Sequence, residues 1–283
     1  MRNNPKKAEA LLALASYYES AGNLPGRDAL LDRLAHGTDF PDGMLTAGQF
    51  LLDRRDLEKA RTYISMGAHS RPEDFRYVRL LALIQLAEGQ TGEARQTLSE
   101  GSRHHPDNPT LLSLHASLLV ETGGPADISK ARKEFEELLR HSPNEPEYLY
   151  GLGRALFRQG EFPQARAAFQ QLLGLTPDPT AARLALGEVS LALNQERAAR
   201  TYADAVLQTS PHNPGGRLLR AKSLVFSGQT NDGLKELKDL SREYPAWLDV
   251  TVEIGRAYLT AHDWDHAEAV FRAAYNPGHS DFK

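Results

Sequence analysis

Apolar positions between residues 146 and 177 predict two short helices joined by a tight turn. In the first segment the small or apolar positions are spaced three, one and three apart, and they are Leu149, Leu152, Gly153 and Leu156. The second segment continues the pattern with Ala165, Ala168, Phe169, Leu172 and Leu173. This spacing is typical of helices with one buried face. Gly160 lies between the segments, where a positive φ costs least, and Pro177 follows the second segment and ends that helix.

The same pattern recurs along nearly the whole chain, which predicts an all-α fold. The position of Gly153 is filled in turn by Ala15, Gly48, Ala82, Ala116, Gly153, Gly187, Ala221 and Gly255, at spacings of 33, 34, 34, 37, 34, 34 and 34. The position of Ala165 is filled by Arg27, Ala60, Ala94, Ala131, Ala165, Ala199, Gly233 and Ala267. Small residues at two fixed positions let the two helices of a hairpin approach closely. A leucine at Gly153 or Ala165 is therefore expected to cost about 1–3 kcal/mol by overpacking.

The period predicts a single array of about eight stacked helical hairpins over residues 1–283. We place the repeats at approximately 8–40, 41–74, 75–108, 109–145, 146–179, 180–213, 214–247 and 248–277. The fourth repeat is three residues longer, and we expect its turn, Thr122 to Asp127, to absorb the insertion. Arg27 replaces the usual alanine, so the first hairpin is expected to pack less closely. Gly233 is expected to make the seventh hairpin the softest, and Asn194 is expected to replace the turn glycine in the sixth.

The order Leu149, Leu152-Gly153, Leu156, Ala165, Phe169 and Pro177 resembles the tetratricopeptide repeat family, of bacterial type. The resemblance extends over about residues 5 to 277. It implies a right-handed α-solenoid whose first helices face a concave groove, and a non-enzymatic scaffold that binds a protein or peptide in that groove.

The resemblance also implies which positions project into the groove: the second, fifth, ninth, twelfth and thirteenth of each repeat. The main candidates for peptide binding are Tyr150, Arg154, Phe157, Arg158, Leu184, Glu188, Lys222, Phe226 and Arg256. The same register adds Glu147, Leu191, Leu218, Val225, Asp249, Val252 and Leu259, and in the third repeat Arg76, Arg79, Leu83 and Leu86. Arginines beside aromatic residues suit a peptide with an acidic side chain or a C-terminal carboxylate. The alternative is a solvated charged face, with large residues such as Phe226 packing on the next helix.

Composition narrows the chemistry further. The net charge is −4 and there is no cysteine, so the chain offers no basic surface for nucleic acid and no thiol for catalysis or disulfides. No apolar run reaches the length of a membrane span. His262 and His266 lie four residues apart, but no third ligand is evident, and we expect no metal site, no cofactor and no catalytic residue.

Two alternatives to a peptide-binding scaffold stay open. Copies of the chain could associate through uncapped ends, where Val270, Phe271 and Ala274 form an apolar face. The chain could instead be the recruiting arm of a larger bacterial export or polysaccharide-assembly protein or enzyme. Pro5 lies where a preceding repeat would close, which suggests a fragment of a longer array. The compartment is therefore left open between the cytoplasm and periplasm of a bacterium.

Overall fold

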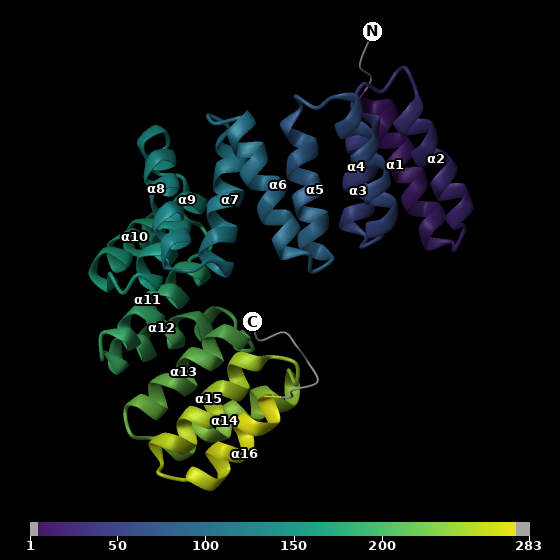
Figure 1. Cartoon of the computed structure of the whole chain (residues 1–283). Helices are drawn as coiled ribbons and strands as arrows, with labels where there is room; N and C mark the ends of the chain where they lie inside the picture. The colour runs from purple at the N-terminus through teal and green to yellow at the C-terminus, as the bar shows by residue number, and fades with distance from the viewer. Residues whose placement is uncertain (1–4, 276–283) are drawn as a thin grey trace. The chain divides into compact units, whose positions relative to one another are not determined.

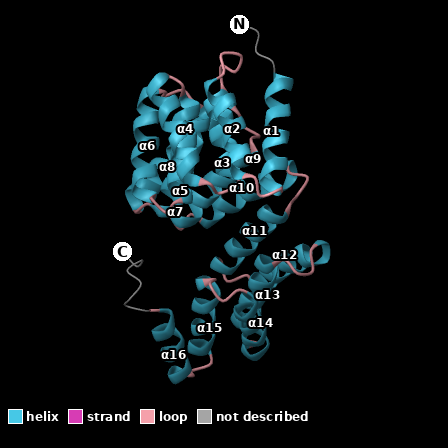
Figure 2. Ribbon diagram, turned by 90° about the vertical axis from the view of Figure 1, so that its right-hand side faces the viewer, coloured by secondary structure: helices cyan, strands magenta, loops and turns pink. Residues whose placement is uncertain are grey.

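The computed structural model describes residues 5–275, and these residues form sixteen helices and no strand (Figures 1 and 2). The chain divides into two compact units, Met1–Leu138 and Leu139–Lys283, which are described separately below as unit 1 and unit 2. The predicted boundary at residue 277 and the first four residues lie outside the described part. Whether the chain forms one continuous array stays a prediction.

Unit 1 contains seven helices and most of an eighth. Their bounds are α1 (Pro5–Ser20), α2 (Leu24–His36), α3 (Gly43–Asp53), α4 (Leu57–Ser70), α5 (Phe75–Ala87), α6 (Thr91–His104), α7 (Pro109–Thr122) and α8 (Pro125–His141). The helices of unit 2 are α9 (Pro146–Arg158), α10 (Phe162–Leu175), α11 (Thr180–Ala192), α12 (Glu196–Thr209), α13 (Pro214–Phe226), α14 (Thr230–Glu243), α15 (Leu248–Thr260) and α16 (Trp264–Ala274).

Consecutive helices pair as hairpins, as the period predicts. The pairs α1–α2, α3–α4 and α5–α6 pack together in unit 1, and α9–α10, α11–α12, α13–α14 and α15–α16 pack together in unit 2. Odd-numbered neighbours also touch, α3 with α5 and α5 with α7 in unit 1, and α11 with α13 and α13 with α15 in unit 2. First helices therefore form one side of each unit, and the predicted all-α stack of helix-turn-helix hairpins is confirmed.

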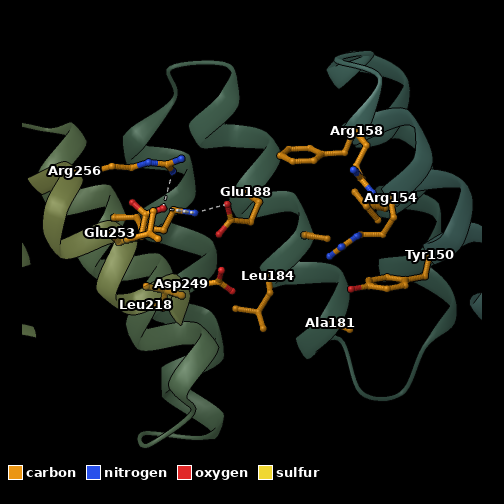
Figure 3. Close-up of a pocket in the computed structure, with 15 residues that line it drawn as sticks. Tyr150, Arg154, Arg158, Ala181, Leu184, Glu188, Leu218, Asp249, Glu253 and Arg256 are labelled. Atoms are coloured by element: carbon orange, nitrogen blue, oxygen red, sulfur yellow. Dashed lines mark hydrogen bonds and ion pairs between the residues drawn. The ribbon is translucent and has the colours of Figure 1, made fainter. Parts of the chain in front are cut away.

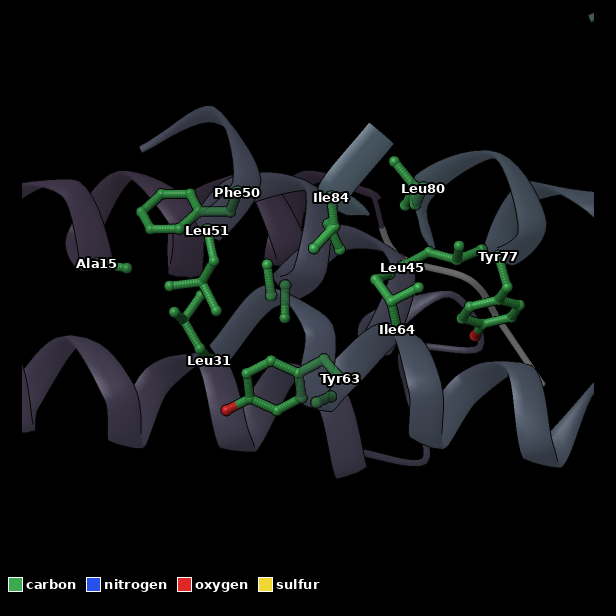
Figure 4. Packing of buried hydrophobic residues seen from close by; sticks show 13 residues of the cluster. Ala15, Leu31, Leu45, Phe50, Leu51, Tyr63, Ile64, Tyr77, Leu80 and Ile84 are labelled. Carbon is green, nitrogen blue, oxygen red and sulfur yellow. The ribbon is translucent and has the colours of Figure 1, made fainter. Parts of the chain in front are cut away.

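Each hairpin encloses apolar side chains between its two helices and those of the next hairpin. In unit 1 a cluster from α1 to α5 includes Leu31, Leu51, Ile64 and Ile84, all at most 1% exposed (Figure 4). In unit 2 Phe169 is also 1% exposed and packs with neighbours from α9 and α11. Burial of such side chains contributes roughly 1.5–3 kcal/mol each, which favours ordered stacking of otherwise marginal helices.

Left-handed residues reverse the chain between paired helices. The turns contain Gly22, Arg55, Gly89, Gly160, Asn194, Gly228 and His262, with φ between 54° and 84°. The predicted left-handed role of Asn194 is confirmed at φ 54°. His262, like Asn194, is of a type enriched in this conformation, whereas Arg55 at φ 63° shows that the position also accepts a residue without that preference.

The three-residue insertion lies within the predicted segment, Thr122 to Asp127, but its residues are helical, so the expectation of a longer turn is wrong. Helix α7 ends at Thr122 and α8 begins at Pro125, so only Gly123 and Gly124 separate them. Helix α8 has 17 residues, whereas α10, α12 and α14 each have 14, and the insertion therefore lengthens the second helix. Proline is well suited to the first helical position, because its missing N–H would have no partner there.

Arg27 lies in the small-residue register but is not loosely packed. It is 3% exposed, and its guanidinium donates to Glu19 at 3.0 Å, to Asp28 at 2.9 Å and to Asp56 at 2.7 Å. These three carboxylates come from α1, from α2 and from the residue preceding α4. The first hairpin thus has a buried ion-pair network at this position, and the network also reaches the second hairpin.

Candidate functional site

The main candidate site is a cavity of about 510 Å³ on the first-helix side of unit 2. Its walls come from α9, α11, α13 and α15, with Phe169 of α10 behind them. Figure 3 shows Tyr150, Arg154 and Arg158 on one side, and Asp249, Glu253 and Arg256 on the other. Leu184 and Glu188 lie between these two groups. The cavity therefore extends across four successive hairpins.

Repeat register explains why these side chains meet. The residues three positions before the small residue of the first helix are Tyr150, Leu184, Leu218 and Val252, and all four line the cavity. The residues one position after it are Arg154, Glu188, Lys222 and Arg256, and these also line it. The two sets are four residues apart on each helix and so share one helical face. Stacking the helices turns two sequence positions into an apolar row and a charged row.

Eight of the nine main candidates line this cavity. They are Tyr150, Arg154, Phe157, Arg158, Leu184, Glu188, Lys222 and Arg256. Phe226 is not among the lining residues: it is the last residue of α13 and is 53% exposed. Four other residues of the register do not line the cavity either: Glu147, Leu191, Val225 and Leu259. Leu191 and Val225 are only 5% and 7% exposed.

Sequence reasoning did not identify Phe169, Ala181, Ala185 and Glu253 as lining residues. Ala185 and Glu253 follow directly after the apolar row formed by Leu184 and Val252, so a slightly wider helical face would have included them. Phe169 belongs to a second helix and reaches the cavity because Gly153 on α9 leaves room for its ring. A Cβ added at Gly153 would overlap that ring.

A salt-bridge network occupies the wall formed by α11, α13 and α15. Lys222 Nζ lies 2.7 Å from Glu188 Oε2 and 3.8 Å from Glu253 Oε1, and Arg256 Nη1 donates to Glu253 Oε1 at 2.9 Å. Two cations and two carboxylates thus neutralise one another across three hairpins (Figure 3). The side chains of Lys222 and Glu253 are only 16% and 12% exposed, so this network is partly desolvated.

The opposite wall, on α9, is aromatic and cationic. The ring centroids of Tyr150 and the buried Phe169 lie 5.9 Å apart. Those of Phe157 and Phe162 lie 5.4 Å apart. These contacts restrict the aromatic side chains, and rigid aromatic groups provide contact area at low entropy cost. Arg154 and Arg158 are adjacent to them on the same helix. This wall therefore combines apolar area with guanidinium donors suited to a carboxylate.

The structural positions predicted from the repeat lie inside the hairpins. Ala82, Ala116, Ala165 and Ala199 are 0% exposed. A Cβ added at Gly48 or Gly187 would overlap Ile64 or Leu219, respectively. Pro177 lies two residues beyond the end of α10.

Within residues 5–275, no group of three or more histidine, aspartate or glutamate side chains has an arrangement that could hold a metal ion. His266 instead lies 2.8 Å from Asp263 through Nδ1 and stacks on Tyr258. In the same part of the chain, no helix combines the length and apolarity needed to cross a bilayer.

Comparison with known proteins agrees with this architecture. A tetratricopeptide repeat profile matches residues 45–109, 116–178 and 154–214, more than half of the chain. The chain belongs to the tetratricopeptide repeat family. Proteins with this fold are typically scaffolds for protein–protein interaction, and members of the family are generally non-enzymatic. None of the curated proteins compared with the chain matches it significantly.

Solved structures are similar in fold. A tetratricopeptide repeat protein from Parabacteroides merdae has a TM-score of 0.70 at 19% identity, with 85% of this chain and 94% of that chain covered. The TPR protein TTC0263 of Thermus thermophilus has a TM-score of 0.54 at 20% identity, covering 65% and 98%. A chain of the APC/C hetero-tetramer Cut9–Hcn1 has a TM-score of 0.66 at 17% identity, covering 89% and 54%. At these identities the likeness shows the fold alone.

Proposed function

We propose that the chain is a non-enzymatic scaffold that holds a peptide segment of a partner protein in the cavity of unit 2. The observation that carries this proposal is the convergence of eight predicted residues from four hairpins on one cavity of about 510 Å³. A cavity of this size lies in the range of specific ligand sites. Its walls offer both aromatic anchors and charged groups.

The charge distribution indicates what kind of segment fits. Glu188 and Glu253 are already paired with Lys222 and Arg256, so they do not require a ligand for compensation. With Arg154 and Arg158 the lining has four cationic side chains against three carboxylates, Asp249 included, so its formal net charge is +1. A segment with an apolar side chain against Tyr150 and a carboxylate near the arginines would complement this wall.

Selection from a displayed library of random short segments tests this proposal. Segments enriched on the wild-type chain are synthesised, and their affinities are measured by fluorescence anisotropy. Tyr150→Ala and Arg154→Glu are each expected to weaken binding by at least about tenfold, as expected when a central anchor is removed. Circular dichroism shows whether each variant keeps its helices.

Arg197→Glu is the matched control for Arg154→Glu. Arg197 is exposed on α12, a second helix, and it does not line the cavity. The same charge reversal there is expected to leave affinity unchanged. Enriched segments that bind Tyr150→Ala and Arg154→Glu as tightly as the wild type would exclude this cavity as the binding site.

Self-association is a second candidate, and exposed apolar side chains on the terminal helices favour it. Leu14 and Tyr17 on α1 are 40% and 65% exposed, and Trp264 on α16 is 60% exposed. Light scattering over a range of concentrations tests it, because docking between copies raises the mean mass as concentration rises. A constant monomer mass would remove this candidate and leave the peptide-binding proposal untouched.

A further inference from the structure

Helix α1 carries a row of exposed apolar side chains on the side opposite the buried Ala15. The row, called the α1 outer face below, consists of Ala10, Ala13, Leu14, Tyr17 and Ala21, the last directly after the helix. Its spacing of three, one, three and four residues places all five on one helical face. Leu14 is 40% and Tyr17 is 65% exposed. The row is distinct from the groove side of unit 1, where Leu12 lines a cavity with α3 and α5.

The equivalent face of the next first helix, α3, is a packing surface. Phe50 occupies the register of Tyr17, one period of 33 residues later, and it is only 6% exposed. Gly43 occupies the register of Ala10, and a Cβ added there would overlap the backbone of Leu34 on α2. The preceding second helix thus covers this face in the second hairpin. On α1 the same face has the composition of a helix-packing surface, yet no residue between 5 and 275 covers Tyr17.

The order of small and large residues makes the α1 outer face complementary to itself. When two copies of α1 pack antiparallel with their centre between Ala13 and Leu14, Tyr17 of one copy faces Ala10 of the other, and Leu14 faces Ala13. Each bulky side chain then meets a small one, as a knob meets a hole between packed helices. A two-fold axis makes each of these contacts twice, so a single face supplies both halves of the interface.

We propose that the α1 outer face binds the α1 outer face of a second copy of the chain, antiparallel and about a two-fold axis. This rests on self-association, the second candidate function, and it specifies the face and the geometry. A helix of 16 residues is about 24 Å long and about 10 Å wide. One face therefore offers only a few hundred Å², less than the roughly 800 Å² per partner of stable interfaces. We expect a weak dimer, with a dissociation constant above about 1 μM.

An end-to-end contact between α1 of one copy and α16 of another is the alternative arrangement. Beside Phe271, helix α16 exposes Glu268 and Arg272, whose side chains are 61% and 80% exposed. Packing the uncharged α1 outer face there would take these two charges out of water. An end-to-end contact also leaves one α1 and one α16 without a partner, so it continues into longer assemblies, whereas a two-fold contact closes at two copies.

Disulfide cross-linking of the full chain tests the geometry. The sequence contains no cysteine, so a single introduced cysteine reports one contact between copies. Ala13→Cys places a thiol beside the two-fold axis, where its counterpart on the second copy lies close enough to form a disulfide under mild oxidation. Ala167→Cys is the matched control, because Ala167 is an exposed alanine on α10. Linked dimers of Ala13→Cys are expected to form at least about tenfold faster than those of Ala167→Cys.

Light scattering over a range of concentrations measures the association without any cross-link. The mean mass is expected to rise from that of one chain towards that of two chains and no further. Leu14→Glu is expected to raise the dissociation constant at least about tenfold, because it brings two like charges together beside the axis. Trp264→Glu is the control, since Trp264 on α16 is 60% exposed and lies outside this contact. Circular dichroism shows whether both variants keep their helices.

Equal cross-linking rates for Ala13→Cys and Ala167→Cys would overturn the two-fold contact. So would a mass that grows beyond two chains and that falls with Trp264→Glu but not with Leu14→Glu, although self-association itself would then stand. A chain that stays monomeric up to about 1 mM would reject both the two-fold contact and self-association. Each of these results leaves peptide binding in the unit 2 cavity untouched, because the selected segments test that site separately.

Discussion

Lys222 Nζ lies 2.7 Å from Glu188 Oε2, and these two residues are one repeat of 34 residues apart. They occupy the same position on consecutive first helices, α13 and α11, and Lys222 also approaches Glu253 on α15. A cation between two carboxylates therefore links three hairpins along the cavity wall. The contribution of this ion-pair network to stability can be compared with that of exposed ion pairs, because the Lys222 side chain is only 16% exposed.

Lys222→Met is expected to lower the free energy of unfolding by about 1–3 kcal/mol, because it leaves Glu188 without its cation and weakens compensation of Glu253. Urea denaturation followed by circular dichroism measures this. Adding Glu188→Gln to Lys222→Met should recover part of the loss. Lys235→Met is the control, since Lys235 is exposed on α14, and a change within about 0.5 kcal/mol is expected there. Equal losses at both lysines would contradict a special role for the network.

The contact between Gly153 and Phe169 gives a second prediction. A Cβ at Gly153 would overlap the Phe169 ring, whereas a Cβ at Gly174 on α10 meets nothing within 4 Å. Gly153→Ala is therefore expected to destabilise the chain by about 1–3 kcal/mol through overpacking. Gly174→Ala is expected to be neutral or to stabilise it by up to about 1 kcal/mol, because alanine favours helix.

Thermal and urea unfolding compare the two variants. Combining Gly153→Ala with Phe169→Leu should restore part of the lost stability, because the smaller side chain makes room for the methyl group. If Gly153→Ala were as harmless as Gly174→Ala, the hairpin could shift without cost and the close approach of α9 and α10 would not be required.

Much of the fold and of the unit 2 site could be predicted because both follow one period. Gly153 and Gly187 mark where first helices meet bulky neighbours, and residues at fixed distances from them, such as Arg154 and Glu188, share one face. In a regular repeat, the position of a residue within the repeat therefore predicts the helical face on which it lies, without knowledge of any single contact.

Features that depend on contacts particular to one hairpin could not be predicted in this way. The Gly123-Gly124-Pro125 sequence is typical of a turn, but the proline begins α8, and the added residues are helical. Phe226 follows the register yet falls at the end of its helix, outside the cavity lining. Arg27 breaks the small-residue rule, and its compensation by Asp56 involves the next hairpin.

The repeat pattern favours a small residue at position 27, but we predict that replacing Arg27 with alanine lowers stability. Arg27→Ala restores the usual small residue, but it removes the cation shared by Glu19, Asp28 and Asp56. We expect a loss of about 2–4 kcal/mol, somewhat below that for a fully buried pair because the carboxylate side chains are 26–29% exposed.

Urea denaturation measures the loss, and Arg33→Ala on the exposed face of α2 is the control, with an expected change within about 0.5 kcal/mol. Neutralising Glu19 and Asp56 as glutamine and asparagine in the Arg27→Ala chain should return part of the stability. A chain that gains stability from Arg27→Ala alone would show that close helix packing outweighs the ion pairs.

Asp74 provides a prediction for pH. It precedes α5, where it accepts from the backbone N–H of Arg76 at 3.1 Å and from the guanidinium of Arg76 at 2.7 Å. The hydrogen bond from the Arg76 side chain is the main cause that holds the pKa of Asp74 below its ordinary value of 3.8. Since the folded-state pKa is lowered, the carboxylate contributes stability that is present above the unfolded-state pKa. That contribution is lost as the pH falls through the lower folded-state value.

Asp74→Asn keeps an acceptor for the helix start but removes the charge, so it isolates this contribution. At neutral pH the variant is expected to be less stable than the wild type by about 1–2 kcal/mol. That difference should stay constant down to about pH 5, shrink as the unfolded-state carboxylate takes up its proton near pH 3.8, and vanish once the pH is below the lower pKa of the folded state. Urea midpoints measured from pH 7 to acid, with the exposed Glu73→Gln as a control, test the sign. A difference that grew on acidification would show that Asp74 binds its proton more readily in the folded chain, and would contradict the role of Arg76.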